Sequence, residues 1–412
     1  MIDFNSFQLN NGLKVIVHED PNTPLAAVNL IYKVGSRNEN PNKTGFAHLF
    51  EHLMFGGSVN IPSFDGPLQL AGGESNAFTN PDITNYYNIL PANNLETAFW
   101  LESDRMLSLD FSQRALDVQR KVVVEEFNET CLNQPYGDSW HKVLAMAFKV
   151  HSYNWPTIGK EVSHIRDATL EDVKDFFFKY YRPNNAILCV AGGVKTNEVE
   201  ALAKKWFDEI EAGEKIEQQI PEEPPQTEAR KMETKADVPI NVIYKVFHIC
   251  NRFDPKFHAT DMLTDILSDG KSSRLYENLI KKQKLFSDIN AHVTGSLDKG
   301  LFVIEGKLNP GVSMEKAEEG IDQELEKVKC EKVEEKELEK VKNKIESYLV
   351  FSEVNLLNRA MSLAYFEMAG DPGMVNLETE KYHDVSRENL LEAAQTNLQQ
   401  ENSSALYYFS NN

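Results

Sequence analysis

Two histidines and a glutamate at helical spacing are the residues of this sequence best suited to chemistry. His48, Glu51 and His52 form an H-x-x-E-H pattern. The segment from Phe46 to Phe55 contains neither Pro nor Gly, so we expect a helix there. Residues three or four apart share a helix face, so both imidazoles can reach one metal ion with the carboxylate beside them. The pattern predicts a zinc site.

Zinc at such a site predicts hydrolytic chemistry. A catalytic zinc has three protein ligands and an open position for water, whose pKa it lowers to about 7. Glu51 is then the expected general base, because it can take the proton of that water and pass it to a leaving amine. The pattern therefore predicts peptide-bond hydrolysis with one Zn²⁺ per chain, and it requires a third ligand elsewhere in the sequence.

The third ligand is expected on a second helix, predicted over residues 115–130. Four of its positions form one stripe, which we interpret as an inward face: Gln119, Val122, Val123 and Glu126. A carboxylate on an inward face is costly unless it is paired or bound to a metal, so Glu126 is the favoured ligand. Glu125 and Glu129 are the alternatives, although as solvated charges they need no partner.

A strand pair follows the predicted metal helix. Residues 76–79 and 84–90 are predicted as two strands. A strand that passes close to the metal helix can pair with an extended substrate, so Asn76, Ala77 and Phe78 are candidate substrate-binding residues. An ordinary inner strand is the other interpretation of this segment, and the pattern alone does not separate the two.

The order of the predicted elements indicates an internal duplication. Residues 26–191 are predicted to contain, in order, a strand, a helix, a strand pair, two helices and a strand. The same order is predicted again after the linker. Residues 213–237 combine three prolines with many charges, which predicts the linker itself. We expect an α+β fold of two homologous α/β half-domains related by a pseudo-twofold axis, each a mostly antiparallel sheet packed with helices. Residues 1–212 would form the zinc-binding catalytic half and residues 238–412 a half that binds no metal.

The second half is predicted to keep the scaffold without the ligands. Aligning the two halves by their elements places Asp261, Thr264 and Asp265 where the H-x-x-E-H residues stand in the first half. Further along, residues 333–369 are predicted as one long helix.

Charge and composition argue against several classes of function. A net charge of −20 opposes non-specific binding to nucleic acid or to an anionic membrane. No window reaches about 18 uninterrupted apolar residues, so no membrane span is expected.

The four cysteines lie far apart, which is typical of buried thiols in a reducing compartment. With no signal or transit pattern near the N-terminus, we expect a cytoplasmic protein.

Four segments together resemble the pitrilysin and insulinase group of zinc metallopeptidases, in the small subfamily near the mitochondrial processing peptidases. The likeness covers nearly the whole chain and is carried by residues 48–52, 75–87, 120–126 and 181–186. Its motifs are specific, because the inverted zinc signature and a distant glutamate are both required.

The resemblance implies a role for each matching position. His48 and His52 would bind zinc, and Glu51 would be the base. The third ligand of the family is the last residue of a Val-Val-x-Glu-Glu sequence, which here is Glu126. The edge strand over residues 76–78 would hold the substrate through backbone contacts and a side-chain pocket.

Two departures from the family pattern affect these expectations. Gln119 stands seven residues before Glu126, where the family often carries a glutamate; an amide can still hydrogen-bond near the site but adds no negative charge, so zinc affinity or rate can differ. Residues 236–412 contain no Arg followed by Tyr seven positions later, a pair that many relatives use to grip the substrate carbonyl. Relatives of this length close a chamber with a second chain, so we expect a homodimer or a heterodimer with a related subunit.

The sequence therefore favours a zinc-dependent endopeptidase that cuts extended peptides or oligopeptides in an enclosed chamber. The alternative is a non-catalytic assembly or binding subunit of the same fold that acts with a partner chain. A purely structural zinc site would normally use four protein ligands, often cysteines, and no such set lies near in the sequence. The complete set His48, Glu51, His52 and Glu126 favours the enzyme.

Overall fold

The computed structural model describes residues 1–217 and 219–411 of the chain. Gln218, within the predicted linker, and Asn412, at the end of the predicted second half, lie outside the described residues. The chain divides into two compact units made of alternating segments. The first unit comprises Met1–Asn128, Trp155–Ile220 and Val350–Leu377, and the second comprises Glu129–Asn154, Pro221–Leu349 and Glu378–Asn412.

The first unit is built on a six-stranded sheet. Its strands are β1 (Asn5–Gln8), β2 (Lys14–Glu19), β3 (Leu25–Tyr32), β4 (Glu74–Thr79), β5 (Thr84–Pro91) and β6 (Ala186–Gly192). They lie in the order β1-β2-β6-β3-β5-β4, and every neighbouring pair is antiparallel except β2 with β6. The inner strands β3 and β6 are buried almost throughout, which explains their continuous apolar sequence. β4 forms one edge of the sheet.

Helices cover one face of this sheet and share its apolar core. They are α1 (Phe46–Leu53), α2 (Asp65–Leu70), α3 (Leu95–Leu107), α4 (Gln113–Phe127), α6 (Val162–Arg166), α7 (Leu170–Tyr180) and α8 (Thr196–Phe207). The helix predicted around the H-x-x-E-H motif is thus present as α1, and the helix predicted over residues 115–130 as α4.

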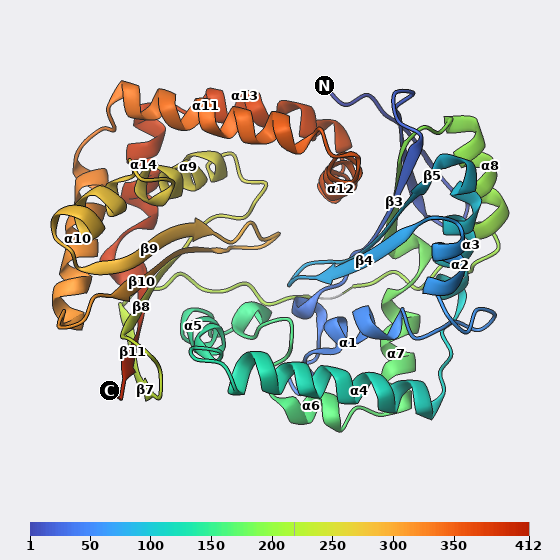
Figure 1. Ribbon diagram of the computed structural model, residues 1–412, viewed down its shortest axis with the longest axis horizontal. Helices are drawn as coiled ribbons and strands as arrows, with labels where there is room; N and C mark the ends of the chain where they lie inside the picture. The colour runs from blue at the N-terminus through green and yellow to red at the C-terminus, as the bar shows by residue number, and fades with distance from the viewer. Residues whose placement is uncertain (218, 412) are drawn as a thin grey trace. The chain divides into compact units, whose positions relative to one another are not determined.

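The other face of the first sheet is covered by α12 (Leu356–Glu367), which packs along β3 and β6 (Figure 1). Arg359 of α12 forms an ion pair with Asp20 at 2.9 Å, just after β2. Residues 350–377 thus belong to the first unit although they lie late in the sequence. The division of the sequence into halves at the linker stays a prediction.

The prediction of a single helix over residues 333–369 is wrong. The structure has two helices there, α11 (Glu335–Ser352) and α12. Asn355 separates them, because its side chain accepts a hydrogen bond from the backbone N–H of Leu357 and so begins a new helix. The side chain of asparagine can bond to nearby backbone N–H groups and so interrupt a helix. The prediction missed this break because the apolar residues keep helical spacing on both sides of Asn355.

The second unit is built on a five-stranded sheet in the order β7-β11-β8-β10-β9. Its strands are β7 (Arg230–Ala236), β8 (Val242–His248), β9 (Phe286–Val293), β10 (Leu301–Leu308) and β11 (Ser403–Ser410). All neighbouring pairs are antiparallel except β7 with β11. By composition, residues 230–236 belong to the predicted linker, but in the structure they are β7. They form an edge strand whose side chains alternate between exposed and half-buried, so it needs few apolar residues.

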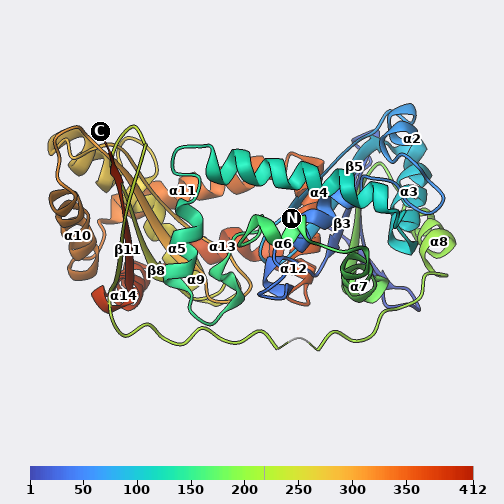
Figure 2. The same cartoon turned by 90° about the horizontal axis from the view of Figure 1, so that it is seen from below.

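Helices lie on both faces of the second sheet. One face packs against a core shared by α9 (Phe257–Ser268), α10 (Met314–Cys330), α11 and α14 (Arg387–Asn397), with α13 (Glu378–His383) beside α9. Figure 2 shows α5 (Ser139–Ala147) beside β8 and β11 on the other face. Both units therefore have the predicted α+β construction of a sheet packed with helices.

Two further expectations can be compared with the structure. Among the described residues, no helix is both long and apolar enough to cross a membrane. Cys131 and Cys189 are buried as expected, but Cys330 is exposed because it lies at the surface end of α10.

Candidate metal centre

The helix α1 carries the two motif histidines on the side away from its core face. Five of its eight residues are buried: Phe46, Ala47, Leu49, Phe50 and Leu53. His48 and His52 lie one turn apart, with side chains 13% and 25% exposed. The apolar residues thus fix the rotation of the helix, and this rotation brings both imidazoles to the same partly open side.

A buried glutamate holds the N-terminus of α1. The N-cap residue Gly45 has a φ of 87° and no side chain that could cap the helix. Instead, the carboxylate of Glu39 accepts hydrogen bonds from the backbone N–H of Gly45 at 2.9 Å and of Ala47 at 2.8 Å. The indole N–H of Trp155 donates a third at 3.0 Å. Burial raises the pKa of Glu39 to about 8, against the opposing effect of these donors.

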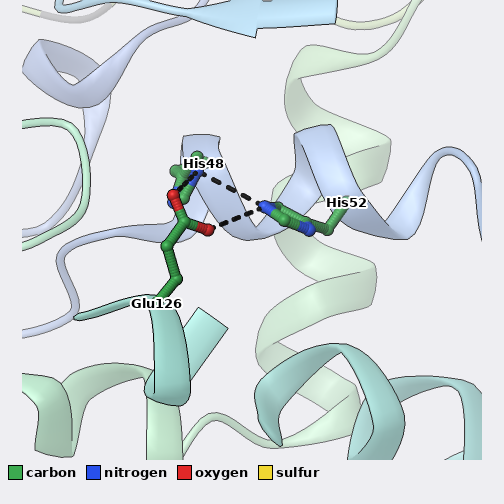
Figure 3. Close-up of side chains that lie close together, drawn as sticks. All are labelled: His48, His52 and Glu126. Atoms are coloured by element: carbon green, nitrogen blue, oxygen red, sulfur yellow. Dashed lines mark hydrogen bonds and ion pairs between the residues drawn. The ribbon is translucent and has the colours of Figure 1, made fainter. Parts of the chain in front are cut away.

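The third side chain comes from α4, which packs against α1 (Figure 3). Glu126 Oε1 lies 3.6 Å from His48 Nε2, and Glu126 Oε2 lies 3.3 Å from His52 Nε2. The two Nε2 atoms are 3.4 Å apart. Within the described residues, this is the one group of three or more His, Cys, Asp or Glu side chains close enough to hold a metal ion together.

These spacings fit a zinc ion. Ligand bonds of about 2.0–2.2 Å in a tetrahedron place the ligand atoms about 3.3–3.6 Å from one another. The three measured separations, 3.3, 3.4 and 3.6 Å, fall in this range. Two imidazole nitrogens and one carboxylate also form a ligand set that catalytic zinc sites use, with a fourth position left for water or substrate.

The electrostatics of His48 and Glu126 favour metal binding as well. Burial lowers the pKa of His48 below its ordinary value, which keeps that imidazole neutral at pH 7 with a lone pair available. The hydrogen bond from His52 lowers the pKa of Glu126, so its carboxylate stays ionised. Neutral histidine and ionised carboxylate are the protonation states that bind a metal.

Glu51 lies on α1 beside this group but is not one of its three members. Its Oε2 atom accepts a hydrogen bond from the hydroxyl of Thr79, the last residue of β4, at 2.6 Å. Sequence reasoning gave Thr79 no role. The available signal was its place at the end of the predicted strand, on the same side as Ala77 by the alternation of strand side chains.

The structure separates Glu126 from its rivals and corrects the interpretation of its helix stripe. Glu125 and Glu129 are exposed, and neither belongs to the histidine group. Val122 is 44% exposed, so the stripe is not an inward face at that position. The buried residues of α4 are instead Leu116, Val123 and Phe127. Glu126 therefore lies at the boundary between the buried and the open side of the helix.

Gln119 lies away from the ligand group. It is half-buried, and its side-chain amide lies beside Gly56, just after the end of α1. The structure thus places Gln119 near the other end of the metal helix from His48, and its predicted contribution to the zinc site stays a prediction.

The candidate substrate residues lie on an edge strand. Asn76 is exposed, and Ala77 and Phe78 are half-buried, in the middle of β4. Within the described residues, β4 pairs only with β5, and α1 contacts it. An edge strand presents unpaired backbone N–H and C=O groups, so β4 can accept an extended peptide next to the metal helix.

Two α+β units, with an H-x-x-E-H helix and a distant glutamate in the first, define the class of inverted-zincin peptidases. This chain belongs to the insulinase family, peptidase family M16. The family model described as "Insulinase (Peptidase family M16)" matches residues 14–160, and the model described as "Peptidase M16 inactive domain" matches residues 167–345.

Individual relatives agree with this assignment. The zinc protease PqqE of Helicobacter pylori is 35% identical over 353 residues, which are 82% of this chain and 77% of that protein. The crystal structure of a protease from Helicobacter pylori has a TM-score of 0.93 and 29% identity, and the match covers 99% of this chain and 100% of that chain. The mitochondrial-processing peptidase subunit beta of Saccharomyces cerevisiae is 28% identical over 211 residues, 50% of this chain and 45% of that protein.

Proposed function

We propose that this chain is a zinc-dependent endopeptidase that hydrolyses extended peptides. His48, His52 and Glu126 would hold one Zn²⁺ per chain, and Glu51 would act as the general base. The observation that carries the proposal is the set of ligand separations between 3.3 and 3.6 Å, with the Glu51 carboxylate on the same helix. The names of the relatives as zinc proteases support it.

When bound, zinc supplies Lewis-acid chemistry: it polarises a carbonyl group and lowers the pKa of water. The side chains of the protein do the rest. His48 and His52 would offer imidazole nitrogens, and Glu126 would add the negative charge that partly balances the cation. Glu51 takes the proton of the attacking water on its carboxylate and delivers it to the nitrogen of the leaving peptide.

The substrate is held, in this proposal, as an added strand on β4. The backbone of residues 76–78 would pair with the peptide, while neighbouring side chains such as Phe78 form a pocket. Strand pairing requires an extended backbone, so unstructured peptides are the expected substrate class and folded proteins are not. The acidic net charge of −20 gives no reason to expect nucleic acid or an anionic membrane as a partner.

We further propose that the active form is a homodimer or a heterodimer with a related subunit, which encloses the substrate. The yeast relative is named as one subunit of a peptidase, which supports this part of the proposal. The missing Arg and Tyr pair favours a heterodimer and also the second candidate function, a binding subunit that does not cleave. The cytoplasmic location stays a prediction.

The test is to purify the full chain and measure bound zinc and the cleavage of a mixture of unstructured peptides by mass spectrometry. We expect one zinc per chain, and cleavage that a chelator abolishes and added zinc restores. A chain that binds zinc but cleaves no peptide, alone or mixed with a related subunit, would contradict the endopeptidase and support the binding subunit.

A variant sharpens this test. Glu51→Gln should keep its zinc but lose roughly 10²-fold or more of the cleavage rate, because the general base is gone. The matched control is Glu125→Gln, since Glu125 is an exposed glutamate on α4 outside the ligand group. Full turnover in Glu51→Gln would overturn the assignment of the base.

A further inference from the structure

The strand β4 has two faces with different neighbours. Side chains alternate along a strand, so Ser75, Ala77 and Thr79 share one face. Ala77 packs against the apolar core of the first unit, which shows that this is the face turned toward the helices. Thr79 continues that face to the end of the strand, where its hydroxyl donates the 2.6 Å hydrogen bond to Glu51 Oε2.

This hydrogen bond is a specific one. Among the described residues, Thr79 is the only side chain that donates a hydrogen bond to Glu51. An ionised acceptor makes such a bond short and stronger than one between neutral groups. Glutamate has three rotatable side-chain bonds, and a hydrogen bond to one of its oxygens restricts all three. The contact therefore selects one orientation of the carboxylate beside His48 and His52.

We propose that Thr79 is a positioning residue for the reaction. Its hydroxyl holds Oε2 of Glu51, so that Oε1 stays free to receive the proton. The same strand would pair with the peptide at residues 76–78, so one rigid element aligns both the scissile bond and the base. A fixed geometry between the reacting groups contributes directly to the rate. This inference rests on the proposed function, which assigns Glu51 as the base.

The hairpin also supplies a matched control. Thr84 stands directly opposite Thr79 in the β4–β5 register. It is fully buried, and its hydroxyl donates to the backbone oxygen of Val34 at 2.9 Å. The two threonines are therefore neighbours in the same hairpin. The Thr84 hydroxyl donates to a backbone oxygen, whereas the Thr79 hydroxyl donates to the side chain of Glu51. Valine in either place has nearly the same shape and removes only the hydroxyl group.

The experiment compares the full-length wild type with Thr79→Val, Thr79→Ser, Thr84→Val and Glu51→Gln. Each variant is measured for kcat and KM on an unstructured peptide, for zinc affinity by competition with a chelator, and for its unfolding temperature. We expect Thr79→Val to lower kcat roughly tenfold, the effect of losing one hydrogen bond to a charged group. Its KM and zinc affinity should not change. Thr79→Ser keeps a hydroxyl and should restore kcat to within about twofold of the wild type.

Thr84→Val should lower the unfolding temperature without lowering kcat, because the hydroxyl of Thr84 donates to the backbone oxygen of Val34 and not to Glu51. Wild-type kcat in Thr79→Val would overturn the inference, as would a loss of zinc affinity shared by Thr79→Val and Thr84→Val. Neither result touches the proposed function, provided that the wild type cleaves and Glu51→Gln does not. A wild type that cleaves nothing instead contradicts the proposed function.

Discussion

The helices α1 and α9 stand in similar surroundings but carry different chemistry. Each precedes an antiparallel strand pair in its unit and packs against the first strand of that pair. Among its ionisable side chains, each has a pair one turn apart: His48 and His52 on α1, and Asp261 and Asp265 on α9. Within the described residues, only the pair on α1 belongs to a group of three side chains close enough to hold a metal ion together.

On α9, the carboxyl groups of Asp261 and Asp265 are not part of a ligand group within the described residues, and burial shifts their pKa values. Asp261 accepts a hydrogen bond from the hydroxyl of Tyr382 at 2.6 Å, and burial raises the pKa of Asp261. Burial, reinforced by Asp261, raises the pKa of Asp265 to about 7. These carboxyl groups are thus shifted toward the neutral state, which binds metal poorly. The comparison shows that a pair of ionisable side chains on this helix is not enough for a metal site. A third side chain from another helix, such as Glu126 of α4, is needed as well.

The sharpest way to break the comparison is to remove one imidazole. His52→Ala should lose bound zinc and with it all measurable peptide cleavage, because two ligands do not hold a catalytic zinc. The equivalent change on α9, Asp265→Ala, is the control and should leave zinc content unchanged. Zinc is measured by atomic absorption on the purified chains. Full zinc occupancy in His52→Ala would show that the zinc ion lies elsewhere in the chain.

The two helices also begin differently. Glu39 caps the N-terminus of α1, whereas Lys256, the N-cap of α9, makes no side-chain capping hydrogen bond. Glu39→Ala should lower the free energy of unfolding by about 2–4 kcal/mol, because three buried N–H donors lose their acceptor. Lys256→Ala should cost less than about 0.5 kcal/mol. Urea unfolding measures both, and equal losses would mean that Glu39 contributes nothing special to α1.

A smaller effect concerns pH. The pKa of Asp265 is about 7 in the folded chain and near its ordinary value of about 3.9 when unfolded. The folded state therefore binds more protons between these values, so this group's contribution to stability is fully present below about pH 4 and is lost as the pH rises through about 7. Asp261 and Asp269 add to the shift and Lys344 opposes it.

Asp265→Asn should accordingly reduce the fall in unfolding free energy between pH 5 and pH 8, by about 1–3 kcal/mol. Urea unfolding of the wild type and the variant at both pH values provides the measurement. A variant as sensitive to pH as the wild type would show that other groups set this dependence. The corresponding change on α1 is not informative in the same way, because zinc binding would mask the titration of its histidines.

Local periodicity explains what the sequence could predict about the site. The H-x-x-E-H spacing and the Val-Val-x-Glu-Glu sequence concern residues within single helices, so α1 and the choice of Glu126 over Glu125 could be predicted. The contacts of Glu51 with Thr79 and of Glu39 with α1 join different elements, and no spacing within one segment indicates them.

The fold was predictable where apolar patterns were long. The strand predicted over residues 84–90 has such a pattern, and it is present as β5, Thr84–Pro91. The elements that were missed carry few apolar residues, such as the edge strand β7, or are interrupted by one polar residue, such as α12 after Asn355. The placement of α12 in the first unit depends on long-range packing, which the order of elements along the sequence does not contain.

The position of α12 has a consequence for synthesis. A ribosome that has produced the first 220 residues has made every strand of the six-stranded sheet, but not the helix that shields its second face. Until residue 367 has left the exit tunnel, that apolar face is open to chaperones or to association with other nascent chains. The first unit is therefore not complete until most of the second unit has been synthesised.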